Sequence, residues 1–229
     1  MKEKLDYKTL RLFPYVIFAM IVAIMTSMLP PLIQMFISGD VDEAAMYQMN
    51  DSLFMLCFFF TYMAIIGILS CLYHLSIINR WFGVSCNMTG AYIITEAVVY
   101  VMKWISEFEG IPKWFDIILL FSKMVPTACL LMMLIFTLRG AADAYEEMGK
   151  KSKRLGCLRT EVYIIAAFAS QIMLNVVISL ENGTENLSVF AVIFISIVYI
   201  FNVAIMIIMY VRVKNFSYDY YIYSYNNQK

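Results

Sequence analysis

Long apolar runs are the feature of this sequence that most restricts how the chain can fold. A helix that crosses the hydrocarbon layer of a membrane, roughly 30 Å thick, needs about 20 predominantly apolar residues. Five runs meet that requirement, at 12–37, 53–78, 117–138, 162–180 and 187–211. Because 62% of the 229 residues are apolar and only 15% are charged, one small core could not hide this surface from water. The sequence therefore predicts an all-α polytopic membrane protein and argues against an ordinary water-soluble enzyme.

A sixth stretch, 84–105, is less apolar because it contains two charged residues, and its placement decides the topology. If it spans, the chain crosses six times, and all 17 Lys and Arg except Lys103, Lys113 and Lys123 lie in segments on the side of the termini. Short cytoplasmic segments collect basic residues in this way. If it does not span, the basic cluster at 139–159 moves to the outside. We therefore predict six transmembrane helices with both termini cytoplasmic.

The loops between these runs are too short for a separate soluble domain, so we expect one transmembrane domain over residues 1–229. Residues 1–11 alternate basic and apolar side chains and predict an amphipathic interfacial helix, with Leu10 among the residues toward lipid. The segment 139–159 is expected to be a basic inner loop. The tyrosine-rich segment 212–229 is expected to be a cytoplasmic tail whose aromatic rings lie at the membrane boundary.

One face of the 84–105 stretch carries polar side chains. Tyr92, Glu96, Tyr100 and Lys103 follow one another at spacings of four, four and three, which places them on the same side of a helix. An ionisable group inside a span costs free energy unless it meets protein or water. Two interpretations follow. The face lines a translocation path or contacts a partner subunit, or else Glu96 makes one intramembrane hydrogen bond while Lys103 extends to the headgroups.

Motifs for chemistry are scarce in this sequence. A phosphate-binding loop of the form GxxxxGK[ST] would cradle ATP, but the nearest text, at 149–152, lacks the earlier glycine because position 144 is Ala. The single His and the absence of a CxxC pair favour no metal site, and no cofactor is expected. His74 and Cys86 could form a thiolate–imidazole pair as in a membrane peptidase, although nothing in the sequence orients them. We expect no enzymatic activity, and the net charge of zero gives no sign of nucleic-acid binding.

The layout resembles the type-2 permease subunits of bacterial ATP-binding-cassette exporters. Like them, the chain has a basic amphipathic start, six expected spans, both ends inside and about this length. In that family the second span ends in a basic-aromatic segment, and here residues 79–83 read Asn-Arg-Trp-Phe-Gly. Gly90, Tyr92 and Thr95 are similar to residues that follow it in the family. The family's next residues, Leu-Pro-Val, are replaced at 96–98 by Glu-Ala-Val.

The resemblance implies a function. The chain would be a permease subunit in a bacterial plasma membrane, paired with a separate ATP-binding subunit and a second permease copy or paralogue. It would export a hydrophobic or amphipathic compound or peptide. Arg80, Trp81 and Phe82 would receive the motion of the ATPase, with Trp and Arg as interface anchors; an ordinary membrane-boundary cluster is the other interpretation, and 139–159 is a second candidate contact. The leading alternative is a signalling or immunity protein that binds a peptide without transport.

Overall fold

The computed structural model of the chain describes residues 7–36, 43–106, 114–180 and 189–227. Their secondary structure is helical, and no β-strand occurs among them. The helices are α1 (Tyr7–Phe36), α2 (Glu43–Leu75), α3 (Arg80–Ser106), α4 (Trp114–Glu147), α5 (Lys151–Leu180) and α6 (Val189–Asn226). The prediction of an all-α chain is therefore confirmed, and the less apolar stretch 84–105 forms the body of α3.

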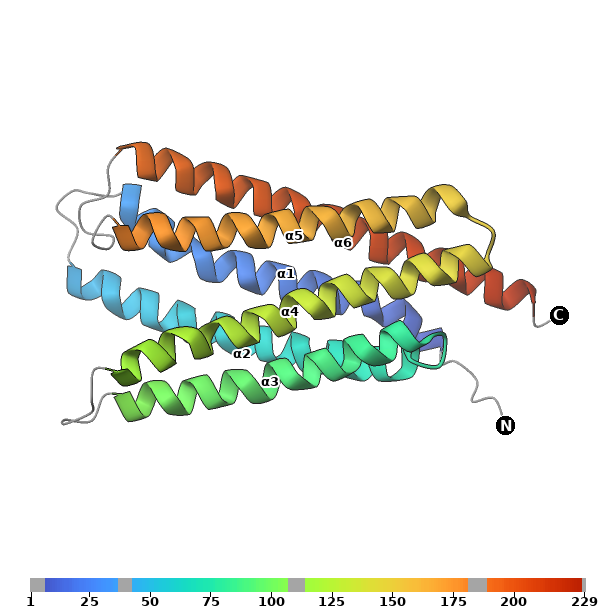
Figure 1. Ribbon diagram of the computed structural model, residues 1–229, viewed down its shortest axis with the longest axis horizontal. Coiled ribbons are helices and arrows are strands. Elements are labelled where there is room, and N and C mark those ends of the chain that lie inside the picture. Colours follow the sequence, from blue (N-terminus) through green and yellow to red (C-terminus); the bar gives the residue numbers. More distant parts are fainter. Residues whose placement is uncertain (1–6, 37–42, 107–113, 181–188, 228–229) are drawn as a thin grey trace.

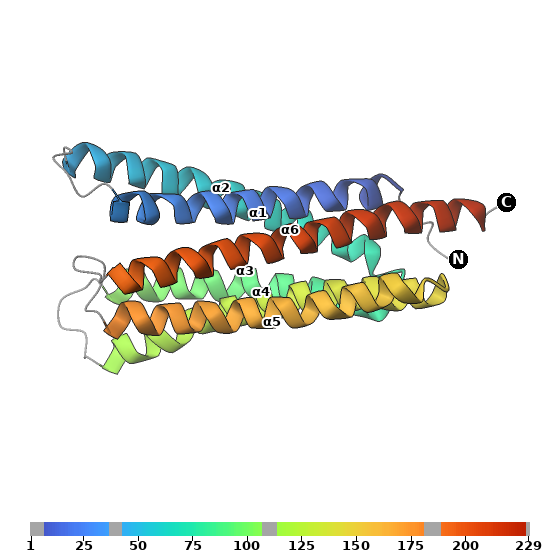
Figure 2. The same ribbon diagram turned by 90° about the horizontal axis from the view of Figure 1, so that it is seen from above.

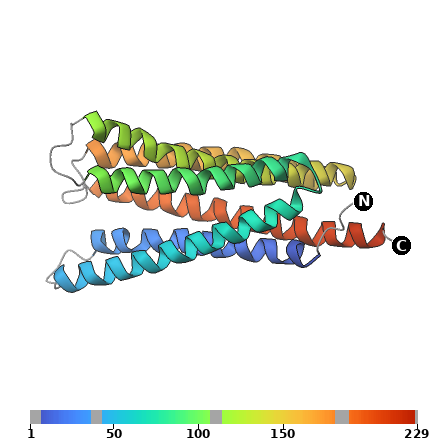
Figure 3. The ribbon, with the colours of Figure 1, turned by 90° about the horizontal axis from the view of Figure 1, so that it is seen from below.

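The helices form one elongated bundle in which each packs against its neighbours in the chain (Figure 1). The last helix, α6, also packs against α1 and touches α4, so it closes the bundle. Seen from above and from below, α1 and α2 lie on one side, α3 to α5 lie on the other, and α6 runs between them (Figures 2 and 3). This central position lets α6 contact residues from both halves of the chain.

One end of the bundle gathers the segments that the sequence predicts to be cytoplasmic. The first residues of α1, the last residues of α6, and the two short connections 76–79 and 148–150 all lie there (Figure 1). We call this the inner end. Its composition matches the predicted cytoplasmic side.

Three helices within the described residues are long and apolar enough to cross a membrane: α3 over its whole length, α4 from Met124 and α6 from Ser196. Phe59–Leu75 of α2 is a shorter apolar helical stretch. Large apolar side chains cover the outside of the bundle, among them Ile94, which is 66% exposed, and Ile200, which is 67% exposed. Such a surface is unfavourable in water and suits a lipid environment. These features are those of a membrane protein.

The core of the bundle runs along its axis and includes residues from the first turns of α1. Leu10 is 1% exposed and Phe13 is fully buried. The expectation that Leu10 faces lipid is therefore wrong, because Leu10 belongs to the core in which α1 packs against α2 and α6. Residues 7–11 are the start of α1, and residues 1–6 lie outside the described part of the chain, so the interfacial helix over 1–11 stays a prediction.

The segment 139–159 is not a loop, which corrects that prediction. It consists of the last turns of α4, a short turn at 148–150, and the first turns of α5. Gly149 in this turn has φ of 72°, a left-handed conformation that favours glycine after a helix. The predicted tail 212–229 is likewise helical as far as Asn226. At 38 residues, α6 is about 57 Å long and extends well beyond a bilayer-sized apolar stretch.

Candidate functional site

The first turn of α3, at the inner end, begins with a capping residue. The side-chain oxygen of Asn79 accepts hydrogen bonds from the backbone N–H groups of Trp81, at 3.1 Å, and Phe82, at 3.4 Å. Asn is a favoured residue at this position because its oxygen satisfies N–H groups that have no partner within the helix. The amide nitrogen of Asn79 donates to the Gly140 carbonyl at 2.8 Å. One side chain therefore starts α3 and fastens it to α4.

Trp81 joins the same two helices. Its indole Nε1–H donates to Asp143 Oδ2 at 2.7 Å, and its ring stacks on Phe136 with centroids 5.5 Å apart and planes 9° apart. The Arg80 guanidinium lies 4.8 Å from the centre of the Trp81 ring, and that of Arg139 lies 5.9 Å from it. Stacking and cation–π contacts stabilise such a ring beyond the contribution of its buried area. The residue predicted to anchor a partner thus has four neighbours in its own chain.

The three residues predicted to contact an ATPase differ in accessibility. Arg80 is exposed and Trp81 is half-buried, whereas Phe82 is completely buried. The Phe82 ring packs on Phe216 of α6 at 5.6 Å, and a Cβ at Gly140 would lie only 3.0 Å from it. A partner cannot reach Phe82 in this arrangement, so that residue supports the core. Of the three residues, Arg80 is the one whose side chain is exposed.

The polar face of α3 is only partly enclosed. Tyr92 packs against the hydrophobic core, and Glu96 is half-buried. Tyr62 of α2 lies close enough to interact electrostatically with Glu96 and Tyr92. Tyr100 and Lys103 are exposed on the outside of the bundle. The structure thus brings the first two residues of the face together with α2 and leaves the last two on the surface.

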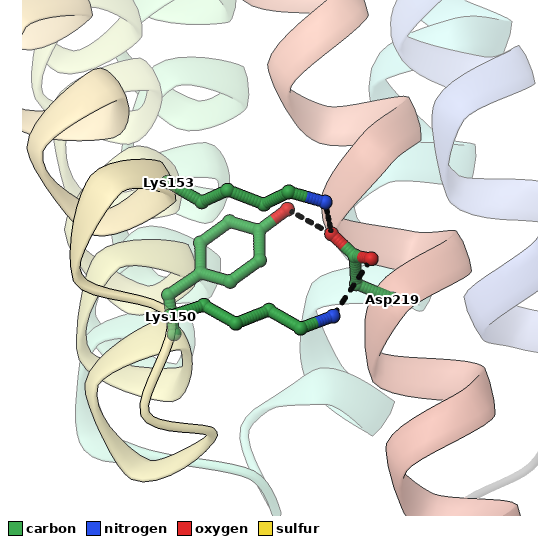
Figure 4. Close-up of polar contacts among 4 residues, drawn as sticks. Lys150, Lys153 and Asp219 are labelled. Carbon is green, nitrogen blue, oxygen red and sulfur yellow. Dashed lines mark hydrogen bonds and ion pairs between the residues drawn. The ribbon is translucent and has the colours of Figure 1, made fainter.

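A cluster that the sequence analysis did not single out centres on Asp219 of α6 (Figure 4). Lys150 Nζ donates to its Oδ1 at 2.8 Å, and Lys153 Nζ donates to its Oδ2 at 2.6 Å. The buried hydroxyl of Tyr145 also donates to Oδ2, at 3.0 Å. One carboxylate therefore connects α6 to the last turn of α4, to the turn after it and to the start of α5.

Asp219 is nearly buried, being 7% exposed. Burial by itself disfavours the carboxylate, but the hydrogen bonds from Lys150, Lys153 and Tyr145 outweigh that cost and lower the pKa of Asp219 below its usual value. Burial, followed by the hydrogen bond to Asp219, raises the pKa of Tyr145. Both groups therefore keep their ordinary charge at neutral pH, and the cluster is an ion-paired connection between helices.

A signal for this cluster was present in the sequence. Asp219 is the one acidic residue in the segment 212–229, and the segment 139–159 carries several Lys and Arg. A tail at the membrane boundary gives no reason to pair these charges. The observation that α6 continues to Asn226 supplies that reason, because the extra turns carry Asp219 to the start of α5.

The candidate catalytic pair is engaged elsewhere. Cys86 Sγ lies 3.8 Å from the Leu69 carbonyl, to which it donates. His74, at the end of α2, is exposed and meets the ring of Tyr73 edge-on at 5.6 Å. The two side chains thus have different partners in this structure.

Comparison with known proteins adds nothing on this or any other site: no protein-family model, no curated protein and no solved structure matches the chain.

Proposed function

We propose that the chain is the membrane-spanning permease subunit of an ATP-driven exporter, with six spans and both termini in the cytoplasm. A separate ATP-binding subunit would drive it, and a second copy or a paralogue would complete the complex. The cargo would be a hydrophobic or amphipathic compound or peptide. Three observations support the proposal: the apolar helices, the lack of a phosphate-binding loop in the sequence, and the gathering of both terminal helix ends at the inner end.

The first turn of α3 is the observation that carries the proposal. A transporter needs an element at its inner face that receives the motion of the ATPase and passes it to the spans. Here Arg80 is exposed at the inner end, while Asn79 and Trp81 fasten the same turn to α4. A displacement at Arg80 would move α3 and α4 together. The resulting motion would run along α3 past Glu96.

The test is co-purification of the full chain from membranes of its host in a mild detergent. We expect an ATP-binding subunit to be retained and ATP hydrolysis to be measurable in the purified complex. Arg80→Ala should lower the retained ATPase by about fivefold or more, which is the effect of losing a typical interface anchor. Lys103→Ala removes an exposed cation from the opposite end of the same helix and should leave retention unchanged.

Stability measurements keep the result interpretable. Because Arg80 is exposed, the thermal unfolding midpoint of the Arg80→Ala variant in detergent should match that of the wild type. Purification without any ATP-binding subunit would contradict the proposal and favour the alternative, a signalling or immunity protein that binds a peptide. Full retention by Arg80→Ala would remove α3 from the contact and leave the turn between α4 and α5 as the remaining candidate.

A further inference from the structure

A groove of about 500 Å³ lies between the first turns of α1 and the last turns of α6 at the inner end. It is separate from the Asp219 cluster and from the first turn of α3, and none of the sites described above uses it. Its walls contain five tyrosines, namely Tyr7, Tyr15, Tyr210, Tyr218 and Tyr221. Tyrosine combines an apolar ring with a hydroxyl, which suits a site that is apolar on one side and wet on the other.

The charge of the groove has one sign. Lys8 and Arg11 of α1 and Lys214 of α6 line it, and its described lining contains no Asp or Glu. The ammonium group of Lys214 lies 5.9 Å from the Tyr210 ring, so the cation is held at the wall of the groove. An anionic group is the ligand that such a lining favours.

The groove lies at the depth expected for lipid headgroups. The first and last predicted spans are 12–37 and 187–211, and the lining residues stand on both sides of these boundaries. Arg11 and Pro14 enclose the start of one span, and Tyr210 and Lys214 enclose the end of the other. Basic pockets between helices on the cytoplasmic side of a membrane are suited to anionic headgroups.

An apolar track continues from the groove toward the middle of the bundle. Tyr15, Phe18 and Val22 follow one another at spacings of three and four on one face of α1, and they are 60%, 49% and 44% exposed. Phe18 meets the Tyr210 ring at 5.1 Å, so the track and the groove share a wall. A ligand with a charged end and a long apolar part would fit both features, whereas a free ion would use only one.

Ser217 supplies an independent observation. It lines the groove and is 5% exposed, and its Oγ has no hydrogen-bond partner among the described residues. A buried hydroxyl without a partner is costly, by an amount comparable to a lost hydrogen bond. A phosphate oxygen in the groove would accept a hydrogen bond from this hydroxyl after rotation of the side chain.

We propose that the groove binds an anionic phospholipid of the inner leaflet, with its phosphate between Arg11 and Lys214 and its acyl chains along Tyr15, Phe18 and Val22. The inference takes from the proposed function only the orientation of the inner end. It does not depend on an ATPase, and it is tested on the purified chain alone. Failure of the export proposal and failure of this one are therefore distinguishable.

The experiment is native mass spectrometry of the full chain in detergent, titrated with phosphatidylglycerol or with phosphatidylethanolamine of the same acyl chains. We expect phosphatidylglycerol to bind about tenfold more tightly or better. The double variant Arg11→Gln/Lys214→Gln should lose that preference. The matched control Lys151→Gln/Arg159→Gln removes two exposed charges on α5, away from the groove, and should keep it.

Ser217→Ala gives a second measurement that does not depend on charge. It should weaken phosphatidylglycerol binding severalfold without lowering the thermal midpoint of the lipid-free protein. Equal binding of the two lipids, or an equal loss in the groove and control variants, would overturn the proposal. Displacement of phosphatidylglycerol by millimolar inorganic phosphate would overturn it too, because the groove would then be a site for the free anion.

Discussion

Two connections hold the inner end of the bundle together, and they use different chemistry. Between α3 and α4, Trp81 stacks on Phe136 and Phe82 fills the space over Gly140. Between α6 and the α4–α5 turn, Asp219 collects two ammonium groups and one phenol. The first connection depends mainly on packing, and the second depends mainly on charge.

The difference teaches how each connection can respond to its surroundings. Packing between buried rings is lost only when the rings separate. An ion pair whose lysines are 38% and 45% exposed can exchange its partners for water and is weakened by salt. We therefore expect α3 and α4 to move as one unit and the ion-paired contact of α6 with the α4–α5 turn to be the one that salt and pH weaken. Four measurements test this contrast, in order of expected effect.

The largest effect is expected for Phe82→Ala. The ring is fully buried against Phe216 and Gly140, so its removal leaves a cavity that costs about 3–5 kcal/mol in the free energy of unfolding. Denaturation in mixed micelles would measure the loss. The milder Phe82→Leu serves as the control and should cost less. A loss below about 1 kcal/mol for Phe82→Ala would mean that packing does not hold α3 in place.

Asp219→Asn is expected to follow. The substitution keeps the shape but removes the charge that Lys150 and Lys153 share, and hydrogen bonds to a charged group contribute about 2 kcal/mol. The same denaturation assay applies. Glu146→Gln is the control, because Glu146 forms an exposed pair with Arg154 at 3.3 Å and such pairs contribute roughly 0–1 kcal/mol. Equal losses in the two variants would show that burial of Asp219 gives it no special weight.

The pH dependence of stability tests the charge of the same carboxylate in the wild-type protein. The pKa of Asp219 is lowered in the folded protein. The stabilisation that its carboxylate contributes is therefore fully present above the pKa of an Asp side chain in the unfolded chain, about 3.9. It is lost as the pH falls through the lower folded pKa. From about pH 5 to about pH 3, the wild type should lose more stability than Asp219→Asn. Parallel pH profiles for the two proteins would contradict this assignment.

Trp81→Phe should have the smallest effect of the four. The variant keeps a ring to stack on Phe136 but loses the indole N–H that donates to Asp143. One hydrogen bond is worth about 1 kcal/mol. Trp81→Leu, which also loses the stacking, should cost more in the same assay. If the two variants lose the same amount, the hydrogen bond rather than the stacked rings makes this connection.

The sequence predicted the parts of the fold that depend on local pattern. Apolar runs and basic segments gave the helices and placed 84–105 within α3, because both signals are read along the chain. The sequence could not show that Leu10 and Phe82 are buried, since only a neighbouring helix decides whether an apolar residue faces lipid or protein. In a membrane protein both surroundings are apolar.

Candidate sites were harder to predict than helices. Tyr92 and Glu96 share a face, as their spacing predicts. Tyr62, which interacts electrostatically with Glu96, lies on α2, and only the tertiary structure shows that it is near. The role of Asp219 could not be predicted from a loop at 139–159 and a tail at 212–229, because such segments have no fixed contact with each other. Once both are helical, α6 packs against α4 and α5 and brings the carboxylate of Asp219 to its partners (Figure 4).

Every proposal above depends on the inner end being cytoplasmic, and thiol labelling tests that claim most directly. In a cysteine-free background, Ser152→Cys at the start of α5 and Asn182→Cys at the opposite side of the predicted topology would be treated with a membrane-impermeant maleimide in intact cells. We expect Asn182→Cys to be labelled and Ser152→Cys to be labelled only after permeabilisation. Labelling of Ser152→Cys in intact cells would contradict the six-span arrangement.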